Sequence, residues 1–389
     1  MKRVCMLITN PFRPDPRMLR EAESLVEAGY SVSILGWDRT KELPAGETLK
    51  SGINVIRIQD VPSGYGIGTR QLLRLPAYWR AIFPILNQLK PDILHCHDFD
   101  TLLPGLWWGR WAQIPVVYDA REYYADLVKP RLHGWSGKAL YKLIGVSEKW
   151  AAKRAAAIIT VDEILGEKYR RIHQQVLVMG HYPSRSMIQQ PSLVFNQSEL
   201  NLLYIGRLSE DRGVLLYADI LHHLLVSGIP SRLHLAGTFV PEEDRALFEH
   251  HAREIEKHIQ MHGWVTVDQI PELLANVDLG LAILKPIPRF KVAIPQKLFE
   301  YMAAGIPIVV SRFPPIEKII EPIQCGLLVE PLDDPKNIAD LISNLWKHPE
   351  QPRKMGLAGR QAVIETYNWE NLATSLVDLY HTLTTQAHS

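Results

Sequence analysis

The sequence has little cysteine: Cys5, Cys96 and Cys325 are its three, and they are widely spaced. Their odd number and apolar neighbours predict buried, reduced thiols rather than a disulfide framework or a cysteine-bound metal. No apolar run reaches the roughly 20 residues that span a bilayer. The apolar run at residues 4–9 is too short for the core of a signal peptide. We therefore expect a cytoplasmic protein.

Length and charge distribution indicate two domains. A chain of 389 residues exceeds one ordinary core. Hydrophobic residues make up 47% and charged residues 22%, as in soluble globular proteins. The net charge of +1 hides an asymmetry: residues 1–180 carry 25 Lys and Arg against 18 Asp and Glu. The basic first half suits an anionic partner surface; a random scatter of charge is the alternative.

The first half reads as alternating strands and helices. Residues 4–9 predict a strand, a proline-rich loop follows, and residues 18–28 form an amphipathic helix before a strand at 31–37. A helical crossover between strands predicts a parallel sheet, whose ligands bind where the strands end. Further strands are expected at residues 91–97, 116–119, 155–161 and 176–179.

The second half repeats the pattern after a polar, irregular stretch at residues 184–198, which reads as a linker. A strand at 200–205 precedes a helix at 214–225. Later strands are expected at 233–236, 263–265, 279–284, 308–310 and 323–330, and later helices at 338–346 and 369–383. We expect two doubly wound α/β domains, 1–183 and 199–368.

The stretch PQKLFEYMAAGIPIVVS at 295–311 predicts a short helix, a helix-ending glycine and a β-strand within seventeen residues. Pro295 suits the first turn of a helix, and Gly305 suits its left-handed end. Lys297 and Glu300 lie three apart on one helical face. From spacing alone they would make a surface ion pair worth a few tenths of a kcal/mol.

The segment GRLSEDRG at 206–213 follows the predicted strand at 200–205. Gly206 allows close backbone approach, while Arg207 and Arg212 stand near the start of a helix. Free N–H groups, the helix dipole and guanidinium groups all favour a diphosphate. An ordinary surface loop is the alternative.

The segment HCHDFD at 95–100 places two histidines on the same face of a strand. His97 and Asp98 fall at the strand's carboxyl end, where ligands bind. A structural role is the commoner use of a lone histidine at such an end. Metal binding by His95, His97 and Asp98 is a further alternative.

Two basic stretches carry aromatic residues. Residues 70–90 include three arginines beside Trp79 and Phe83, and residues 138–154 include lysines beside Tyr141 and Trp150. A basic amphipathic helix with an aromatic edge lies on anionic membranes. Ordinary packed helices explain most of the same features.

Four ordered elements, DPR…E, HCHD, GRL…R-G and KLFEYMAAG, resemble the motifs of family 4 (group 1) retaining glycosyltransferases. The resemblance implies the GT-B fold, two Rossmann-like domains facing a central cleft, with a C-terminal helix at about 369–385 packing back on the first domain. It also implies transfer of a hexose from a nucleoside-diphosphate sugar to an acceptor hydroxyl, without metal or another cofactor.

The resemblance implies roles for residues on the donor side. Glu300 would hold the donor ribose and His97 the transferred sugar. Arg207 and Arg212 would stabilise the diphosphate, and these two with His97 form the predicted catalytic set. The other predicted donor-binding residues are Gly206, Trp264, Val265 and Lys297.

The predicted acceptor-side residues are Arg17, Asp98, Asp119, Arg121 and Glu122. For Arg17, a surface pair with Glu21 is the alternative. This chain departs from the family at Val292, where a second glutamate is common, at Arg121, where the family often has histidine, and at Arg212, where it has lysine.

The expected partners are a nucleotide-sugar donor, a glycan or lipid-linked acceptor for surface polysaccharide or glycolipid assembly, and an anionic membrane surface, with no nucleic acid. The protein would then be peripheral on the inner face of the membrane. A sugar-nucleotide epimerase of the same fold and a non-catalytic nucleotide-sugar-binding protein are the alternatives.

Overall fold

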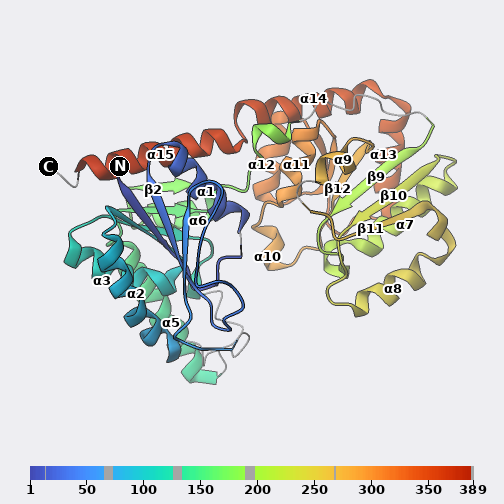
Figure 1. The fold of residues 1–389 in the computed structure, drawn as a ribbon. Helices are drawn as coiled ribbons and strands as arrows, with labels where there is room; N and C mark the ends of the chain where they lie inside the picture. The colour runs from blue at the N-terminus through green and yellow to red at the C-terminus, as the bar shows by residue number, and fades with distance from the viewer. Residues whose placement is uncertain (14, 65–72, 126–133, 189–197, 267–268, 387–389) are drawn as a thin grey trace. The chain divides into compact units, whose positions relative to one another are not determined.

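The computed structural model describes residues 1–13, 15–64, 73–125, 134–188, 198–266 and 269–386. The chain divides into two compact units (Figure 1). Unit 1 comprises Met1–His181 and Leu372–Ser389, and unit 2 comprises Tyr182–Asn371. Each has its own sheet and its own buried core.

Unit 1 is built on an eight-stranded sheet of order β3-β4-β2-β1-β5-β6-β7-β8, and all of its pairings are parallel except that of β3 with β4. Its strands are β1 (Arg3–Leu7), β2 (Ser31–Trp37), β3 (Gly46–Thr48), β4 (Asn54–Ile58), β5 (Ile93–His97), β6 (Val116–Ala120), β7 (Ala157–Thr160) and β8 (Val176–Val178). Its helices are α1 (Pro16–Glu27), α2 (Leu75–Leu89), α3 (Phe99–Ala112), α5 (Gly134–Ala152), α6 (Glu163–Arg170) and most of α15 (Trp369–Gln386).

Local sequence explains how α1 is placed. The Asp15 carboxylate accepts hydrogen bonds from the Arg17 and Met18 amides, and Pro16 occupies the first turn. The helix ends before Gly29, which has φ +88°. The cap and the stop therefore hold Arg17 in the first turn, beside the carboxyl ends of the strands.

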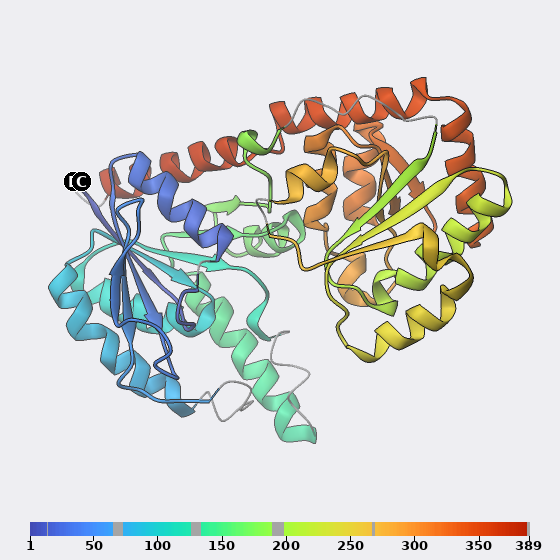
Figure 2. The ribbon, with the colours of Figure 1, turned by 45° about the vertical axis from the view of Figure 1, so that its right-hand side comes forward.

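Unit 2 is built on a six-stranded parallel sheet of order β11-β10-β9-β12-β13-β14. Its strands are β9 (Leu200–Ile205), β10 (Ser231–Ala236), β11 (Ile259–Gly263), β12 (Leu279–Ala282), β13 (Ile308–Ser311) and β14 (Gly326–Val329). Its helices are α7 (Val214–Val226), α8 (Glu243–His251), α9 (Ile270–Leu274), α10 (Pro288–Lys291), α11 (Gln296–Ala304), α12 (Pro314–Ile323), α13 (Pro335–Lys347) and α14 (Glu350–Glu365). Short 3₁₀ turns lie at Arg185–Met187, Glu210–Arg212 and Arg253–His258. Figure 2 shows helices on both sides of this sheet.

Two predicted strands of unit 2 were wrongly bounded. The strand predicted at 263–265 is β11, which runs instead from Ile259 to Gly263. It ends at Gly263 because that residue has φ +67°. β14 begins only at Gly326, because Ile323 ends α12 and Gln324 has φ +57°. Helix α14 was not expected.

The first basic stretch is an ordinary packed helix over its described part. Tyr78, Ile82 and Leu86 of α2 are buried, and the Trp79 indole donates to the Asp100 carbonyl at 2.9 Å. Arg70 lies outside the described residues, as do residues 189–197 of the expected linker. Among the described helices none is long and apolar enough to cross a bilayer.

Candidate functional site

The candidate residues gather where the strand order reverses. In unit 1 the chain runs outward from β1 to β2 and β4, then returns to β5 on the other side of β1. In unit 2 the reversal lies between β9 and β12. Ligands of open α/β sheets bind at such points, beyond the carboxyl ends of the strands.

A buried ionic network occupies the reversal point of unit 1. The Arg17 guanidinium pairs through Nε with Glu21 and through Nη2 with Asp119, both at 2.8 Å. The His97 Nδ1 lies 2.9 Å from the other Asp119 oxygen. Because a carboxylate only accepts, Nδ1 is the donor. The expected surface pair of Arg17 with Glu21 exists, but the two side chains are only 4% and 0% exposed.

Burial and charge shift the titration of this network. Burial alone would raise the pKa of Asp119, but the Arg17 guanidinium and the His97 hydrogen bond outweigh it and lower that pKa. Burial raises the pKa of Glu21 despite Arg17. Asp119 is therefore the anion of the network and Glu21 the carboxyl that most readily holds a proton.

His95 lies behind His97 and connects it to the last helix. The two rings stack with centroids 4.3 Å apart, and the Tyr380 hydroxyl of α15 is 2.8 Å from His95 Nδ1. Burial first, and then His97, keep the pKa of His95 well below its usual value. The neutral His95 ring therefore fixes the plane of His97.

The other predicted acceptor-side residues surround this network. Arg121 pairs with Asp15 at 2.5 Å, and its Nε is 3.6 Å from Asp119. Asp98 has φ +64°, a strained value for a residue other than glycine, and its amide donates to the Asp119 carbonyl. Burial, with Asp100 nearby, raises the pKa of Asp98 to about 7. Glu122 is exposed.

Four of these side chains could place donors around a metal. One donor atom each from Glu21, His95, His97 and Asp119 lies within 4.8 Å of the others. Asp98, named in the metal alternative, is not in the group. Arg17 already pairs with both carboxylates of this group, so a guanidinium stands where a divalent cation would need them. The arrangement fits a metal poorly.

Buried nitrogens without partners point to another kind of ligand. Within the described residues, Arg17 Nη1, His97 Nε2 and Arg121 Nη2 are buried and make no hydrogen bond. Such groups cost free energy unless something pairs with them. Hydroxyl and phosphate oxygens of a substrate are suitable partners for them.

The loop at the reversal point of unit 2, residues 206–213, carries two arginines and two acidic residues. Gly206 follows β9 with φ +129°, and no side chain caps the first turn of α7, which starts after Gly213. Arg207 is exposed, and the Arg212 guanidinium lies 5.2 Å from the Phe290 ring centre. The Lys285 amide donates to the Asp211 carbonyl at 3.0 Å, which ties the following loop to this one.

The Lys297 side chain of α11 extends to the start of this loop, at Gly206. Its Nζ lies 3.4 Å from the Tyr204 ring centre and 3.2 Å from where a side-chain carbon on Gly206 would be. That nitrogen is buried and makes no hydrogen bond among the described residues. Burial first, and then Arg212, lower the pKa of Lys297 well below its usual value.

The remaining donor-side residues differ in burial. Glu300 is 7% exposed and accepts from Gln296 at 3.0 Å. Because both side chains are only 7% exposed, Lys297 and Glu300 do not form the surface pair that their spacing suggested. Trp264 is 76% and Val292 49% exposed.

Helix α11 is fixed in place by Tyr301. Its hydroxyl donates to the Leu203 carbonyl at 3.0 Å and accepts from the Ile205 amide at 3.2 Å. Gly280 leaves room for the ring, because a side-chain carbon there would come within 2.4 Å of it. This contact sets Lys297 and Glu300 against the end of β9.

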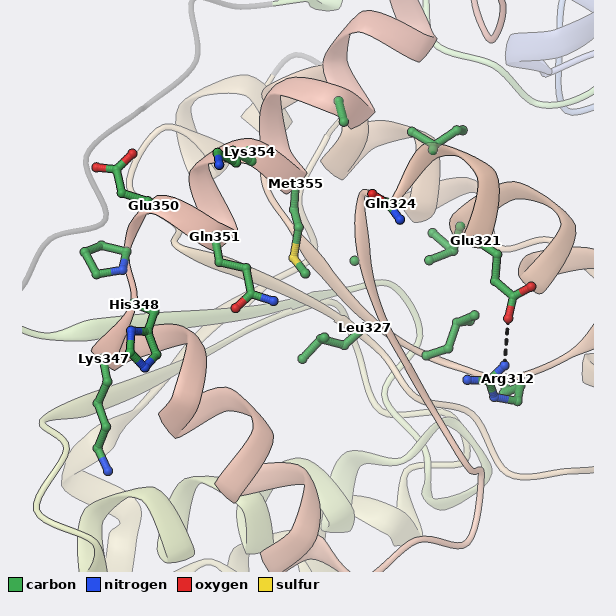
Figure 3. Close-up of a pocket in the computed structure, with 16 residues that line it drawn as sticks. Arg312, Glu321, Gln324, Leu327, Lys347, His348, Glu350, Gln351, Lys354 and Met355 are labelled. Atoms are coloured by element: carbon green, nitrogen blue, oxygen red, sulfur yellow. Dashed lines mark hydrogen bonds and ion pairs between the residues drawn. The ribbon is translucent and has the colours of Figure 1, made fainter.

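A cavity of about 1010 Å³ lies elsewhere in unit 2, beside the edge strand β14 (Figure 3). Its lining includes Arg312, Gln324, Lys347 and Lys354, and no residue singled out in the sequence. Arg312 pairs with Glu317, Glu321 and Glu330, so its charge is already balanced; Figure 3 shows the pair with Glu321. The cavity is not the candidate site.

Sequence reasoning missed the tyrosines of both sites. Tyr380 holds His95, and Tyr204 supports Lys297 and donates to the Arg207 carbonyl at 3.0 Å. Both occupy apolar stripe positions of their elements, and nothing in their spacing distinguishes them from core residues.

Comparisons with known proteins agree with this architecture. The sequence matches two family models, "Glycosyl transferases group 1" over residues 199–348 and "Glycosyl transferase 4-like domain" over residues 14–176. An uncharacterised glycosyltransferase of Methanocaldococcus jannaschii is 24% identical, over 92% of this chain and 91% of its own. The GDP-mannose-dependent alpha-(1-6)-phosphatidylinositol dimannoside mannosyltransferase of Mycobacterium tuberculosis is 25% identical over 77% of each chain.

A solved structure shares the fold. Anabaena HepE, solved in complex with UDP, has a TM-score of 0.70 at 14% identity and covers 98% of this chain and 100% of its own. Two Rossmann-like units with these sheet orders are the GT-B architecture.

Proposed function

Because this chain belongs to the group 1 glycosyltransferases of the GT-B fold, we propose that it moves a hexose from a nucleoside-diphosphate sugar to an acceptor hydroxyl, retaining the anomeric configuration. The single observation that carries the donor assignment is the loop after β9. There Arg207, Arg212, the buried Lys297 amine and the uncapped start of α7 converge. Such a set of donors and positive charge fits a diphosphate.

The chemistry proposed for this loop is stabilisation of the leaving group. The bond from the anomeric carbon to the diphosphate oxygen breaks, and its electron pair leaves with the nucleoside diphosphate. The acceptor oxygen bonds to the same face of that carbon, and its proton passes to the departing phosphate. Preorganised cations stabilise the growing negative charge without any metal. Lys297 suits this role because its amine makes no hydrogen bond within the part of the chain that the structure describes.

We assign acceptor recognition to Arg17 and Arg121 of the unit 1 network, and contact with the transferred sugar to His97. Among the described residues, the buried donor Arg17 Nη1 and the buried His97 Nε2 make no hydrogen bond. The His97 ring stacks on His95 and donates from Nδ1 to Asp119. Orientation of reacting groups alone contributes about 7 kcal/mol or more. Arg121, which stands where the family often has histidine, would set the choice of acceptor.

Thermal unfolding with nucleotides tests the donor proposal. UDP, GDP, ADP and dTDP are added in turn, with magnesium and with EDTA. A diphosphate at about 100 times its dissociation constant should add about 2.7 kcal/mol of stability. UDP is tried first because HepE was solved with it; GDP follows because the mycobacterial relative is GDP-mannose-dependent.

Variants and products complete the test. Arg207→Ala should abolish the shift, whereas Arg353→Ala on the exposed face of α14 should leave it intact. Release of diphosphate from the sugar nucleotide only when acceptor is present would exclude an epimerase. The anomeric coupling in the NMR spectrum of the product decides retention. Absence of any nucleotide shift would refute the donor proposal, whereas a shift without transfer to any acceptor would favour the non-catalytic nucleotide-sugar-binding protein that Val292 suggests.

For the acceptor we propose a lipid-linked glycan presented at an anionic membrane surface, as in surface polysaccharide or glycolipid assembly. The basic balance of residues 1–180 supports this choice. Transfer to a lipid-linked glycan in preference to the same glycan free in solution is the expected result. Arg121→His should change the acceptor KM and leave the nucleotide-dependent thermal shift unchanged, whereas unaltered acceptor preference would remove Arg121 from this role.

A further inference from the structure

The outer face of α5 keeps large apolar side chains in solvent. Trp135, Leu143, Val146 and Trp150 are 80%, 63%, 66% and 51% exposed. They recur at helical spacing, so they form one stripe along the helix. Exposed apolar stripes of this size on a protein surface mark an interaction site.

A row of lysines runs beside this stripe. Lys138, Lys142, Lys149 and Lys153 are all exposed, and most of them lie one turn along from a stripe residue. The Arg154 guanidinium stacks on the Trp150 ring at 4.0 Å. The one acidic residue of α5, Glu148, is fully buried. The outward face of the helix therefore presents apolar and cationic groups and no anion.

The opposite face of α5 holds the segment that follows β6. Glu148 accepts hydrogen bonds from the Tyr124 and Ala125 amides, at 3.2 and 3.4 Å. It also accepts from the hydroxyls of Tyr118 and Tyr169, both at 2.9 Å. These contacts hold Tyr124 and Ala125, which follow Arg121 by three and four residues, against the inner side of the same helix.

We propose that α5 docks on an anionic phospholipid surface through this stripe, and that Glu148 thereby sets residues 121–125 at a fixed depth beside the membrane. Indole rings favour the level of the lipid headgroups, and lysines pair with acidic headgroups while their stems lie along the apolar region. Helix α3, which packs beside α5, also carries two exposed tryptophans, Trp107 and Trp111, 71% and 72% exposed. The docking rests on α5 alone, and the role of residues 121–125 in acceptor placement rests on the proposed function.

Vesicle binding tests the docking. The full chain is sedimented with vesicles of phosphatidylglycerol and phosphatidylcholine, and with phosphatidylcholine alone, at low and high salt. We expect binding only to the anionic vesicles. Each lysine replaced should weaken it about fivefold at low salt, so Lys142→Ser with Lys149→Ser should lose about 25-fold. Lys336→Ser with Lys354→Ser, at exposed positions of unit 2, is the matched control and should change little.

Other outcomes would overturn the docking. Equal binding to neutral vesicles, or binding that the Lys142 and Lys149 substitutions leave intact, would place the contact elsewhere. Capture of the chain by polyglutamate but not by vesicles would show that the stripe fits an acidic protein instead. None of these assays contains a nucleotide-sugar donor or an acceptor glycan. A negative result therefore refutes the docking without bearing on the proposed function, which the nucleotide test examines separately.

Hydrogen exchange tests the second half of the proposal. Anionic vesicles should slow exchange of the Tyr124 and Ala125 amides at least about fivefold, because opening that segment would release Glu148 from a docked helix. The effect should vanish in the Lys142 and Lys149 double variant. Unchanged exchange on vesicles that bind the chain would refute the link between α5 and this segment.

Discussion

Replacing Lys297 by methionine should stabilise the free protein and weaken its binding of a nucleoside diphosphate. Most substitutions of a buried charged residue do the opposite, because they leave a partner uncompensated. Lys297 differs because its amine has no hydrogen-bond partner among the described residues. Binding sites whose polar groups are left unpaired for a ligand commonly make the free protein less stable.

The magnitude follows from the unmade hydrogen bonds of that amine and from its contact with the Tyr204 ring. Its unpaired N–H groups cost about 3 kcal/mol, the upper end for a buried unsatisfied group. Its position 3.4 Å from the Tyr204 ring centre returns about 2 kcal/mol through a desolvated cation–π contact. The free energy of unfolding should therefore rise by about 1 kcal/mol in Lys297→Met. Loss of a charge-assisted hydrogen bond of about 1.5–3 kcal/mol should weaken diphosphate binding about 10- to 150-fold.

Urea unfolding with and without UDP measures both effects. Burial lowers the pKa of Lys297, so the unfolded chain binds more protons between the folded pKa and about 10.4. The free energy of unfolding of the unsubstituted protein therefore rises with pH up to about 10.4. The difference in stability between Lys297→Met and the unsubstituted protein should shrink over the same range. Lys318→Met, at an exposed position of α12, should alter neither stability nor binding. A loss of 2 kcal/mol or more in Lys297→Met would refute the reasoning, because it would show that Lys297 is a paired structural cation.

Three further perturbations separate the two units. Burial raises the pKa of Asp98 to about 7, so the folded protein is destabilised where this carboxyl must ionise. The free energy of unfolding should therefore be about 1–3 kcal/mol higher in Asp98→Asn above pH 7, and the difference should shrink as pH falls toward 4. A difference in urea unfolding that does not change with pH would contradict this. Gly237→Ala should abolish nucleotide-dependent thermal stabilisation, because its added side-chain carbon would lie 1.8 Å from the Gly206 carbonyl oxygen. Gly228→Ala is the control, since a side-chain carbon there meets open space. It should lower the free energy of unfolding by about 1–2 kcal/mol and still bind the nucleotide. Tyr380→Phe should cost about 1–3 kcal/mol by leaving His95 Nδ1 unpaired, with nucleotide binding unchanged by calorimetry; equal stability would show that the hydroxyl contributes nothing.

Elements with strong local signals were predictable from the sequence. The strand at 200–205 is β9 as expected, and Gly305 ends α11 with φ +73°. These positions have continuous apolar runs or a residue suited to one backbone conformation. The end of β11 was missed because apolar Trp264 and Val265 continue the pattern of a strand, while the turn at Gly263 stops it.

The residues of the sites were predictable in kind, but their connections were not. The spacing of Arg17 and Glu21 indicated a pair, yet not that Asp119, far along the chain, would complete it in a dry interior. For Lys297, spacing favoured Glu300 as partner, whereas the folded chain turns the amine toward Gly206. Such contacts depend on how strands distant in sequence are ordered in a sheet, which local patterns do not encode.

Unit 1 is assembled from two separate stretches of sequence, with the whole of unit 2 encoded between them. On the ribosome, synthesis at about 5–20 residues per second leaves tens of seconds between the completion of β8 and the appearance of Tyr380. During that interval His95 is without its partner, and the surface of unit 1 that α15 covers faces water. A nascent chain therefore finishes its second unit before its first, and the exposed first unit is where chaperones would be needed most.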